Sequence, residues 1–357
     1  MELVLNEQQA LLAETAERLA AASGGPQRAR ALRDAGGDFD AEAWREVVRA
    51  GWLGTVIAER NGGLGLGLFD LALTLEQAGR RILMAPLAEA AAAAWVLSRA
   101  GTDAAGRALA GLLDGARLIV PATRPSAWGL GGGLRDGSAA ALGGVVPFVP
   151  FAASAHAFLL ATDEIVCLVD RTTPGVAVET KTQVDGATVS TVRCADVVPA
   201  AVLARGAAAQ DLTRALREFL VLAAAAELLG LAAGAHEITL DYIKLRQQFG
   251  KPIGSFQVLQ HRAVDGFIDI ELNRSLLYRV AAAFDAGTHH SAMVSAVKAR
   301  TSRCALVVTR AALQMHGAVG YTDSHDIGLY YKRALALAAR YGGELEHTAR
   351  FSDLTLA

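Results

Sequence analysis

Two stretches in the C-terminal half decide the fold, Arg246-Gln247-Gln248-Phe249-Gly250-Lys251-Pro252 and Gln314-Met315-His316-Gly317-Ala318-Val319-Gly320-Tyr321. Each lies at or near the end of a long apolar run with helical spacing. At such an end a chain can present an arginine, side-chain amides and glycine backbone to a dinucleotide. The two stretches therefore predict long helices whose ends meet a nucleotide.

Working outward from these stretches, the pattern predicts four long helices over 212–245, 256–284, 291–316 and 327–351. Four long helices with short connections are typical of a bundle. The first is apolar nearly all round, so we expect it to be central or to bury a face against another subunit.

The chain before the bundle has two different patterns. Residues 6–113 read as mostly helical, and we interpret the glycine-rich loop 61–67 as a connector between helices. From about 117, short β-rich runs are split by Gly, Pro and Asp, which is typical of an antiparallel barrel or sandwich. The predicted fold class is multidomain α+β. Its parts are an N-terminal all-α domain (1–115), a central antiparallel β-barrel or sandwich (116–205) and a C-terminal four-helix bundle for cofactor binding and oligomerisation (206–357).

Composition excludes several functions. The 357 residues are 52% hydrophobic and 20% charged with a net charge of −2, so nothing attracts nucleic acid or an anionic membrane globally. Cys167, Cys194 and Cys304 match no metal-ligand spacing, so we expect no metal site and a reducing compartment. The N-terminus lacks the basic start of a signal peptide and no apolar run suggests membrane insertion, so we expect a cytoplasmic protein.

Arg246 is the strongest single candidate for cofactor binding. Its guanidinium can clamp a pyrophosphate through two parallel hydrogen bonds, which lysine cannot do. In isolation, an arginine that caps a helix C-terminus would explain it better. Its neighbours favour binding, because Gln248 supplies amide donors, Phe249 a flat face for an adenine, and Gly250 no side chain. The same wall continues through Ile253, Phe256 and Gln257.

In the second stretch, Gly317 and Gly320 let backbone approach a ligand closely and Ala318 adds only a methyl group. A helix C-cap would explain a lone His-Gly equally well. We interpret His316 as a structural histidine, because it has no partner at metal-ligand spacing.

Together the two stretches resemble the flavin-binding segments of the acyl-CoA dehydrogenase family. The pattern Asp241-Tyr242, then Arg246, then 248–257 is similar to the family segment, as is 314–321 followed by His325-Asp326-Ile327. The resemblance implies FAD as cofactor and acyl-CoA as substrate. The cofactor contacts that we expect are Arg246, Gln248, Phe249, Ile253, Phe256, Gln257, Gln314, Met315, Gly317, Ala318 and Gly320.

The family's catalytic carboxylate is missing from its two usual positions. Counted in the family's registers, these fall on Tyr341 near the C-terminus and on Leu220 in the first bundle helix. In the loop that holds the flavin ring, Arg124 replaces a glutamate. Glu218 and Glu227 are the candidates for the base that remain on the first bundle helix. Both are weak candidates, because neither lies at the expected place on that helix.

The positions at which this chain departs from the family pattern all fall on one half of the active site. This resembles actinobacterial steroid-degrading dehydrogenases, which are heterotetramers with two copies of each of two paralogous subunits. The resemblance implies the subunit that completes the ADP end of FAD, with the base on its partner and electron-transfer flavoprotein as electron acceptor. The acyl group would be a steroid or lipid degradation intermediate. Two alternatives stay open: a complete homomeric enzyme with a displaced base, and a non-catalytic scaffold.

Overall fold

The computed structural model describes residues 5–123, 135–136 and 141–356. The chain forms two compact units. One comprises Met1–Ala31, Ala72–Leu83 and Val221–Ala357, and the other Leu32–Leu71 and Met84–Leu220. The predicted division into three domains, 1–115, 116–205 and 206–357, is based on the type of secondary structure and not on compactness. It stays a prediction.

The N-terminal part is helical, as expected. Asn6 begins the first helix with a capping box, in which its side chain accepts from Gln9 N–H and the Gln9 side chain accepts from Asn6 N–H. Asp40 and Thr102 cap later helices in the same position. The elements are α1 (Glu7–Ser23), α2 (Pro26–Ala35), α3 (Ala41–Arg49), η1 (Trp52–Gly54), η2 (Glu59–Asn61), α4 (Leu68–Arg80), α5 (Leu87–Ala100) and α6 (Asp103–Leu113).

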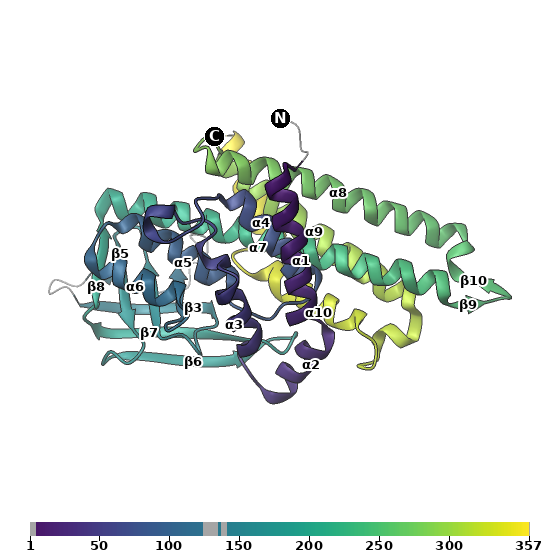
Figure 1. Cartoon of the computed structure of the whole chain (residues 1–357), viewed down its shortest axis with the longest axis horizontal. Helices are drawn as coiled ribbons and strands as arrows, with labels where there is room; N and C mark the ends of the chain where they lie inside the picture. The colour runs from purple at the N-terminus through teal and green to yellow at the C-terminus, as the bar shows by residue number, and fades with distance from the viewer. Residues whose placement is uncertain (1–4, 124–134, 137–140, 357) are drawn as a thin grey trace. The chain divides into compact units, whose positions relative to one another are not determined.

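Over the described residues, the central part contains two four-stranded sheets (Figure 1). One has the order β1-β4-β5-β8 and the other β2-β3-β7-β6. Every pair is antiparallel except β1 with β4, whose parallel register pairs Ile119 with Ala157. The strands are β1 (Ile119–Thr123), β2 (Arg135–Asp136), β3 (Leu142–Pro150), β4 (Ala157–Ala161), β5 (Ile165–Asp170), β6 (Val176–Thr182), β7 (Thr188–Val197) and β8 (Ala201–Arg205).

The C-terminal part is a set of long helices. In Figure 1, α8 and α9 lie side by side, and the β9–β10 hairpin joins α7 to α8 at one end of the bundle. The elements are α7 (Gly206–Leu245), β9 (Gln247–Gln248), β10 (Lys251–Pro252), η3 (Ile253–Ser255), α8 (Gln257–Asp285), α9 (Ser291–His316), η4 (Gly317–Tyr321), α10 (Ile327–Ala339) and α11 (Glu344–Leu356).

The single helix expected over 327–351 is wrong, because two helices, α10 and α11, occupy this segment. Between them Tyr341 has φ 59° and Gly342 has φ 105°, and neither conformation can continue a right-handed helix. Gly342 supplies the break, as glycine is free to adopt positive φ.

The apolar helix α7 is a core element. It is long and apolar enough to cross a membrane, but 89% of its most apolar stretch is buried inside the protein. Two glycines of α7 lie directly against the backbone of α4. A Cβ on Gly230 would lie 1.9 Å from the carbonyl oxygen of Glu76, and a Cβ on Gly234 would lie 2.4 Å from the carbonyl oxygen of Arg80. Glycine thus allows the two helices to approach closely.

Candidate functional site

The first predicted segment forms a hairpin at the end of α7. Gln247–Gln248 pair antiparallel with Lys251–Pro252, and Ile253 N–H donates to Arg246 O over 2.8 Å. The two residues between the strands, Phe249 and Gly250, have φ values of 54° and 78°. Positive φ at both central residues is what a type I′ turn requires. The chain therefore reverses tightly and leaves Arg246 and the Phe249 ring at the surface.

Phe249 is unusual at this position. A type I′ turn favours asparagine before glycine, whereas an ordinary L-residue is strained at positive φ. The Phe249 side chain is also 89% exposed, although its ring makes an edge contact with Phe256, whose centroid is 6.0 Å away. A strained and exposed aromatic ring indicates a surface that receives a flat ligand or a partner.

The second segment forms the end of α9. Gly317 N–H donates to Gln314 O, and Gly317 takes φ 65°, with no atom within 4 Å of the place that a Cβ would occupy. Gly320 is different, because a Cβ there would lie 3.0 Å from both His316 Cβ and Leu313 O. Gly317 thus offers open backbone to a ligand, while Gly320 lets η4 pack onto α9.

The structure brings the two segments together. Tyr242, one turn before Arg246 on α7, stacks on His316 at the end of α9 with ring centroids 4.3 Å apart and an interplanar angle of 27°. The Tyr242 hydroxyl lies 3.4 Å from His316 O and donates to it. Tyr242 was part of the quoted pattern, but it was given no role from the sequence. The sequence feature that could have indicated a role for Tyr242 is its position one helical turn before Arg246, on the same helix face.

The predicted contact residues differ in exposure. Those at the surface are Arg246, Gln248, Phe249, Gln257, Gln314 and Ala318, those half-buried are Ile253, Phe256 and Gly317, and those buried are Met315 and Gly320. Lys251, which the sequence reasoning missed, places its ammonium 4.4 Å from the centre of the Phe256 ring. It adds a positive charge beside the hairpin.

The positions expected for a base offer no free carboxylate among the described residues. Leu220 is fully buried in α7, and Tyr341 lies in the turn between α10 and α11. Glu227 accepts from the buried Arg333 over 2.7 Å, so its carboxylate is committed to an ion pair. Glu218 is 2% exposed. Arg124 lies outside the described residues.

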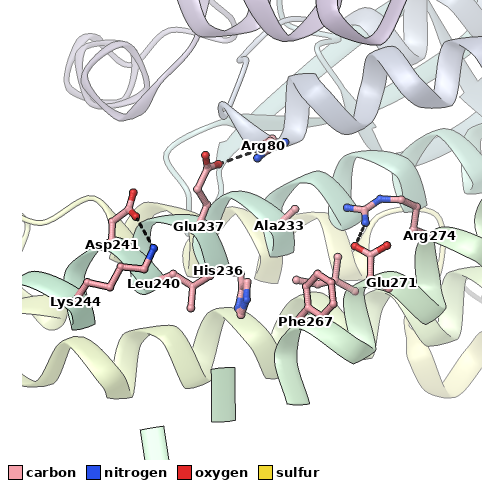
Figure 2. Close-up of a pocket in the computed structure, with 11 residues that line it drawn as sticks. Arg80, Ala233, His236, Glu237, Leu240, Asp241, Lys244, Phe267, Glu271 and Arg274 are labelled. Atoms are coloured by element: carbon pink, nitrogen blue, oxygen red, sulfur yellow. Dashed lines mark hydrogen bonds and ion pairs between the residues drawn. The ribbon is translucent and has the colours of Figure 1, made fainter. Parts of the chain in front are cut away.

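A separate cleft of about 340 Å³ lies between α7 and α8 (Figure 2). Its charges are paired: Arg80 bonds Glu237 over 2.9 Å, Lys244 lies 3.6 Å from Asp241, and Arg274 bonds Glu271. Burial lowers the pKa of His236, so this histidine adds no positive charge at neutral pH. The cleft therefore has no surplus of either sign, and it is not an anion site. Over the part of the chain that the structure describes, no cluster suited to a metal ion occurs.

Comparison with known proteins identifies the fold. The N-terminal domain model of acyl-CoA dehydrogenases matches residues 6–115, and the C-terminal domain model matches residues 220–350. The acyl-CoA dehydrogenase IpdE2 of Mycolicibacterium smegmatis is 30% identical over 356 residues, which cover 97% of this chain and 98% of the relative. The helical parts and the sheets between them are thus those of a flavin-dependent dehydrogenase fold. This chain belongs to the acyl-CoA dehydrogenase family.

Two solved structures are similar over nearly the whole chain. The steroid acyl-CoA dehydrogenase Tcur3481-Tcur3483 is 29% identical with a TM-score of 0.88, covering 98% of both chains. The ChsE4-ChsE5 complex from Mycobacterium tuberculosis is 26% identical with a TM-score of 0.90, covering 99% of this chain and 98% of that one. The cofactor of the family is FAD, as expected from the sequence.

The residues at the shared end of α7 and α9 fit the ADP portion of FAD. Arg246 is exposed for a pyrophosphate, Phe249 presents an uncovered face, and Gly317 leaves open backbone. A guanidinium for the phosphates, a flat ring for the base and backbone free of a side chain suit a dinucleotide.

Proposed function

We propose that this chain is one subunit of a heteromeric FAD-dependent acyl-CoA dehydrogenase. It contributes the ADP-side contacts of the cofactor, while a paralogous subunit supplies the catalytic base. The observation that carries the proposal is an asymmetry. The contact of Tyr242 with His316 joins the two segments proposed for the ADP side, whereas Leu220 and Tyr341 stand where the family resemblance would place a base.

Acyl-CoA dehydrogenation needs a base that takes the α-proton of the thioester. Bound FAD would supply the acceptor for the hydride that leaves the β-carbon. Within this chain the Arg246 guanidinium would hold the pyrophosphate, and Phe249 with Gln248 would hold the adenine side. No proton transfer is assigned to this chain.

The relatives support a heteromer acting on a bulky substrate. One similar structure is described as a steroid acyl-CoA dehydrogenase, and two carry paired subunit names. We propose by analogy a cytoplasmic heterotetramer that acts on a steroid or lipid degradation intermediate as its CoA thioester. Electron-transfer flavoprotein is the proposed electron acceptor, and the proposed domains are 1–115, 116–205 and 206–357.

The test is the flavin content of the chain purified alone and co-purified with candidate paralogous subunits. We expect little flavin in the chain alone and one FAD per site in the correct complex, with acyl-CoA-dependent flavin bleaching only in the complex. A flavin-replete, active homo-oligomer would overturn the proposal in favour of a homomeric enzyme with Glu218 or Glu227 as base. A correct complex that never binds flavin would favour the scaffold alternative.

A further inference from the structure

The contact between Tyr242 and His316 links the two cofactor segments directly. Tyr242 is tied to the hairpin, because Arg246 N–H donates to Tyr242 O over 2.8 Å. His316 immediately precedes Gly317, the open turn of the second segment. A change in the ring contact must therefore alter the spacing between Arg246 and Gly317.

The His316 ring is also held at Nδ1 and by a second histidine ring. Its Nδ1 lies 2.8 Å from Ala312 O, and since a carbonyl only accepts, Nδ1 must carry the proton and donate. His325 packs against it with ring centroids 4.5 Å apart. The His325 ring is fixed in turn, because its Nδ1 accepts from Ile327 N–H over 3.2 Å.

The loop that carries His325 is also anchored. Arg30 of α2 bonds Asp326 over 2.7 Å and donates to Asp323 O over 3.1 Å. The His316 ring thus lies between Tyr242 and a tethered loop, in a buried position where it is 3% exposed. A ring held this closely acts as a spacer and not as a mobile ligand contact.

We propose that Tyr242 and His316 are positioning residues for FAD, whose stacked rings set the distance between the Arg246–Phe249 hairpin and the Gln314–Gly317 turn. An ADP group that spans both segments binds tightly only if that distance is already correct. The inference rests on the proposed ADP-side function and deepens it, since it assigns a role to two residues that make no proposed contact with the cofactor.

The experiment uses the complete complex after removal of FAD, and titrates FAD back while flavin fluorescence reports binding. Tyr242→Leu removes the ring contact and should weaken FAD binding roughly three- to tenfold, the usual size of an aromatic pair. Tyr242→Phe keeps the ring and loses only the long hydrogen bond, so it should restore most of the affinity. His316→Gln removes the stack from the α9 side and should match Tyr242→Leu.

Tyr278→Phe is the matched control. The Tyr278 hydroxyl donates to the buried Glu76 over 2.8 Å in another part of the same unit, so its loss should lower the melting temperature and leave FAD affinity unchanged. If Tyr278→Phe and Tyr242→Leu weaken FAD binding equally, or if Tyr242→Phe is as weak as Tyr242→Leu, the positioning role is wrong.

Failure of the inference and failure of the proposed function give different results. If the parent complex binds no FAD, the ADP-side function itself fails. If Arg246→Ala weakens FAD binding while Tyr242→Leu and His316→Gln do not, the function stands and only the positioning pair is wrong.

Discussion

At the scale of single residues, the strained backbone of Phe249 supports the proposal that its ring contacts a ligand. Its φ of 54° places an L-residue with a bulky side chain in the left-handed region, at a cost of about 1 kcal/mol or more. The ring gains little packing in return, since it is 89% exposed. Stability alone would favour asparagine here, so we infer that the ring serves a contact outside this chain.

Phe249→Asn should therefore change stability and cofactor binding in opposite directions. Asparagine tolerates positive φ, so we expect a melting temperature that is unchanged or slightly raised. Losing the flat ring should weaken FAD binding by the assembled complex roughly tenfold, as an aromatic stack is worth about 1 to 3 kcal/mol. Calorimetry and FAD titration would measure the two effects. A variant with unchanged FAD affinity would show that the ring makes no cofactor contact.

Arg246 gives a second prediction at this scale. Arg246→Ala should weaken FAD retention, because a guanidinium–phosphate pair shielded from water is worth about 2 kcal/mol or more. Arg246→Lys should recover only part of this, since the bidentate geometry is lost. Flavin release on gel filtration measures both, with the exposed Arg279 of α8 replaced by alanine as control. If both Arg246 variants hold flavin as tightly as the parent, the clamp assignment is wrong.

The third prediction separates stability from catalysis. Glu227→Gln should lower the free energy of unfolding by about 3 kcal/mol, because it weakens the ion pair of Arg333, whose side chain is only 2% exposed. The kcat of the assembled enzyme should nevertheless stay within about tenfold, as it should for Glu218→Gln and Tyr341→Phe. Losing a true general base removes a factor of roughly 10² to 10⁴. A drop of that size in any of the three would place the base on this chain.

At the scale of elements, the break between α10 and α11 depends on one glycine. A Cβ on Gly342 would lie 2.7 Å from His347 Nε2, and its φ of 105° is unfavourable for any other residue. The buried Lys298 reinforces the turn by donating to Ala338 O over 2.9 Å and to Gly342 O over 3.0 Å. The turn around Tyr341, where the family resemblance would place a base, is thus a well-fixed part of the fold.

Gly342→Ala should destabilise the protein by about 2 kcal/mol, through strain and the contact with His347. Gly343→Ala is the matched control, because a Cβ there meets nothing within 4 Å. We expect Gly343→Ala to be neutral or stabilising by a few tenths of a kcal/mol. Urea unfolding of both variants measures the difference. Equal stability would contradict the fixed turn.

The sequence predicted elements well where side-chain pattern alone decides them. The apolar run 165–169 became β5, whose residues are buried, and the run 176–178 became the start of β6, where exposure alternates. The end of α10 was not predicted, because the alanine-rich stretch before Arg340 has high helix propensity. Helix propensity depends on local sequence and does not reflect the tertiary contacts of Gly342. The parallel pairing of β1 with β4 was also missed, as strand order depends on contacts distant in sequence.

The same limit applies to the candidate site. Arg246 and Phe249 could be named from their motif, but the turn strain and the contact of Tyr242 with His316 needed coordinates. The helix α7 is central, which is one of the two positions expected for it, because 89% of its most apolar stretch is buried within the chain. Exposed apolar side chains occur on α8, at Val258, Val264, Phe267, Ile268 and Leu272.

At the scale of the whole molecule, buried bases set the response of stability to pH. Burial lowers the pKa of His316 and His236 below the ordinary value. Burial also lowers the pKa of His347 to about 4, against a smaller opposing effect of its bond to Tyr341 O. Burial and the nearby Arg340 lower the pKa of Lys298 to about 7. In each case the unfolded chain binds a proton more readily than the folded one, so acid favours unfolding.

The contribution of His347 overlaps in pH with those of His236 and His316, so a variant at His347 is needed to isolate it. Its unfolded pKa is near 6.5 and its folded pKa about 4, so its contribution to stability is lost as pH falls through that interval, by about 3 kcal/mol in full. Lys298 acts between its unfolded value of 10.5 and about 7, above that interval. His347→Gln keeps an amide donor for Tyr341 O but cannot take up a proton. Urea unfolding between pH 7 and pH 4 should therefore show a shallower loss of stability in the variant than in the parent, and identical slopes would mean that His347 does not titrate in this range.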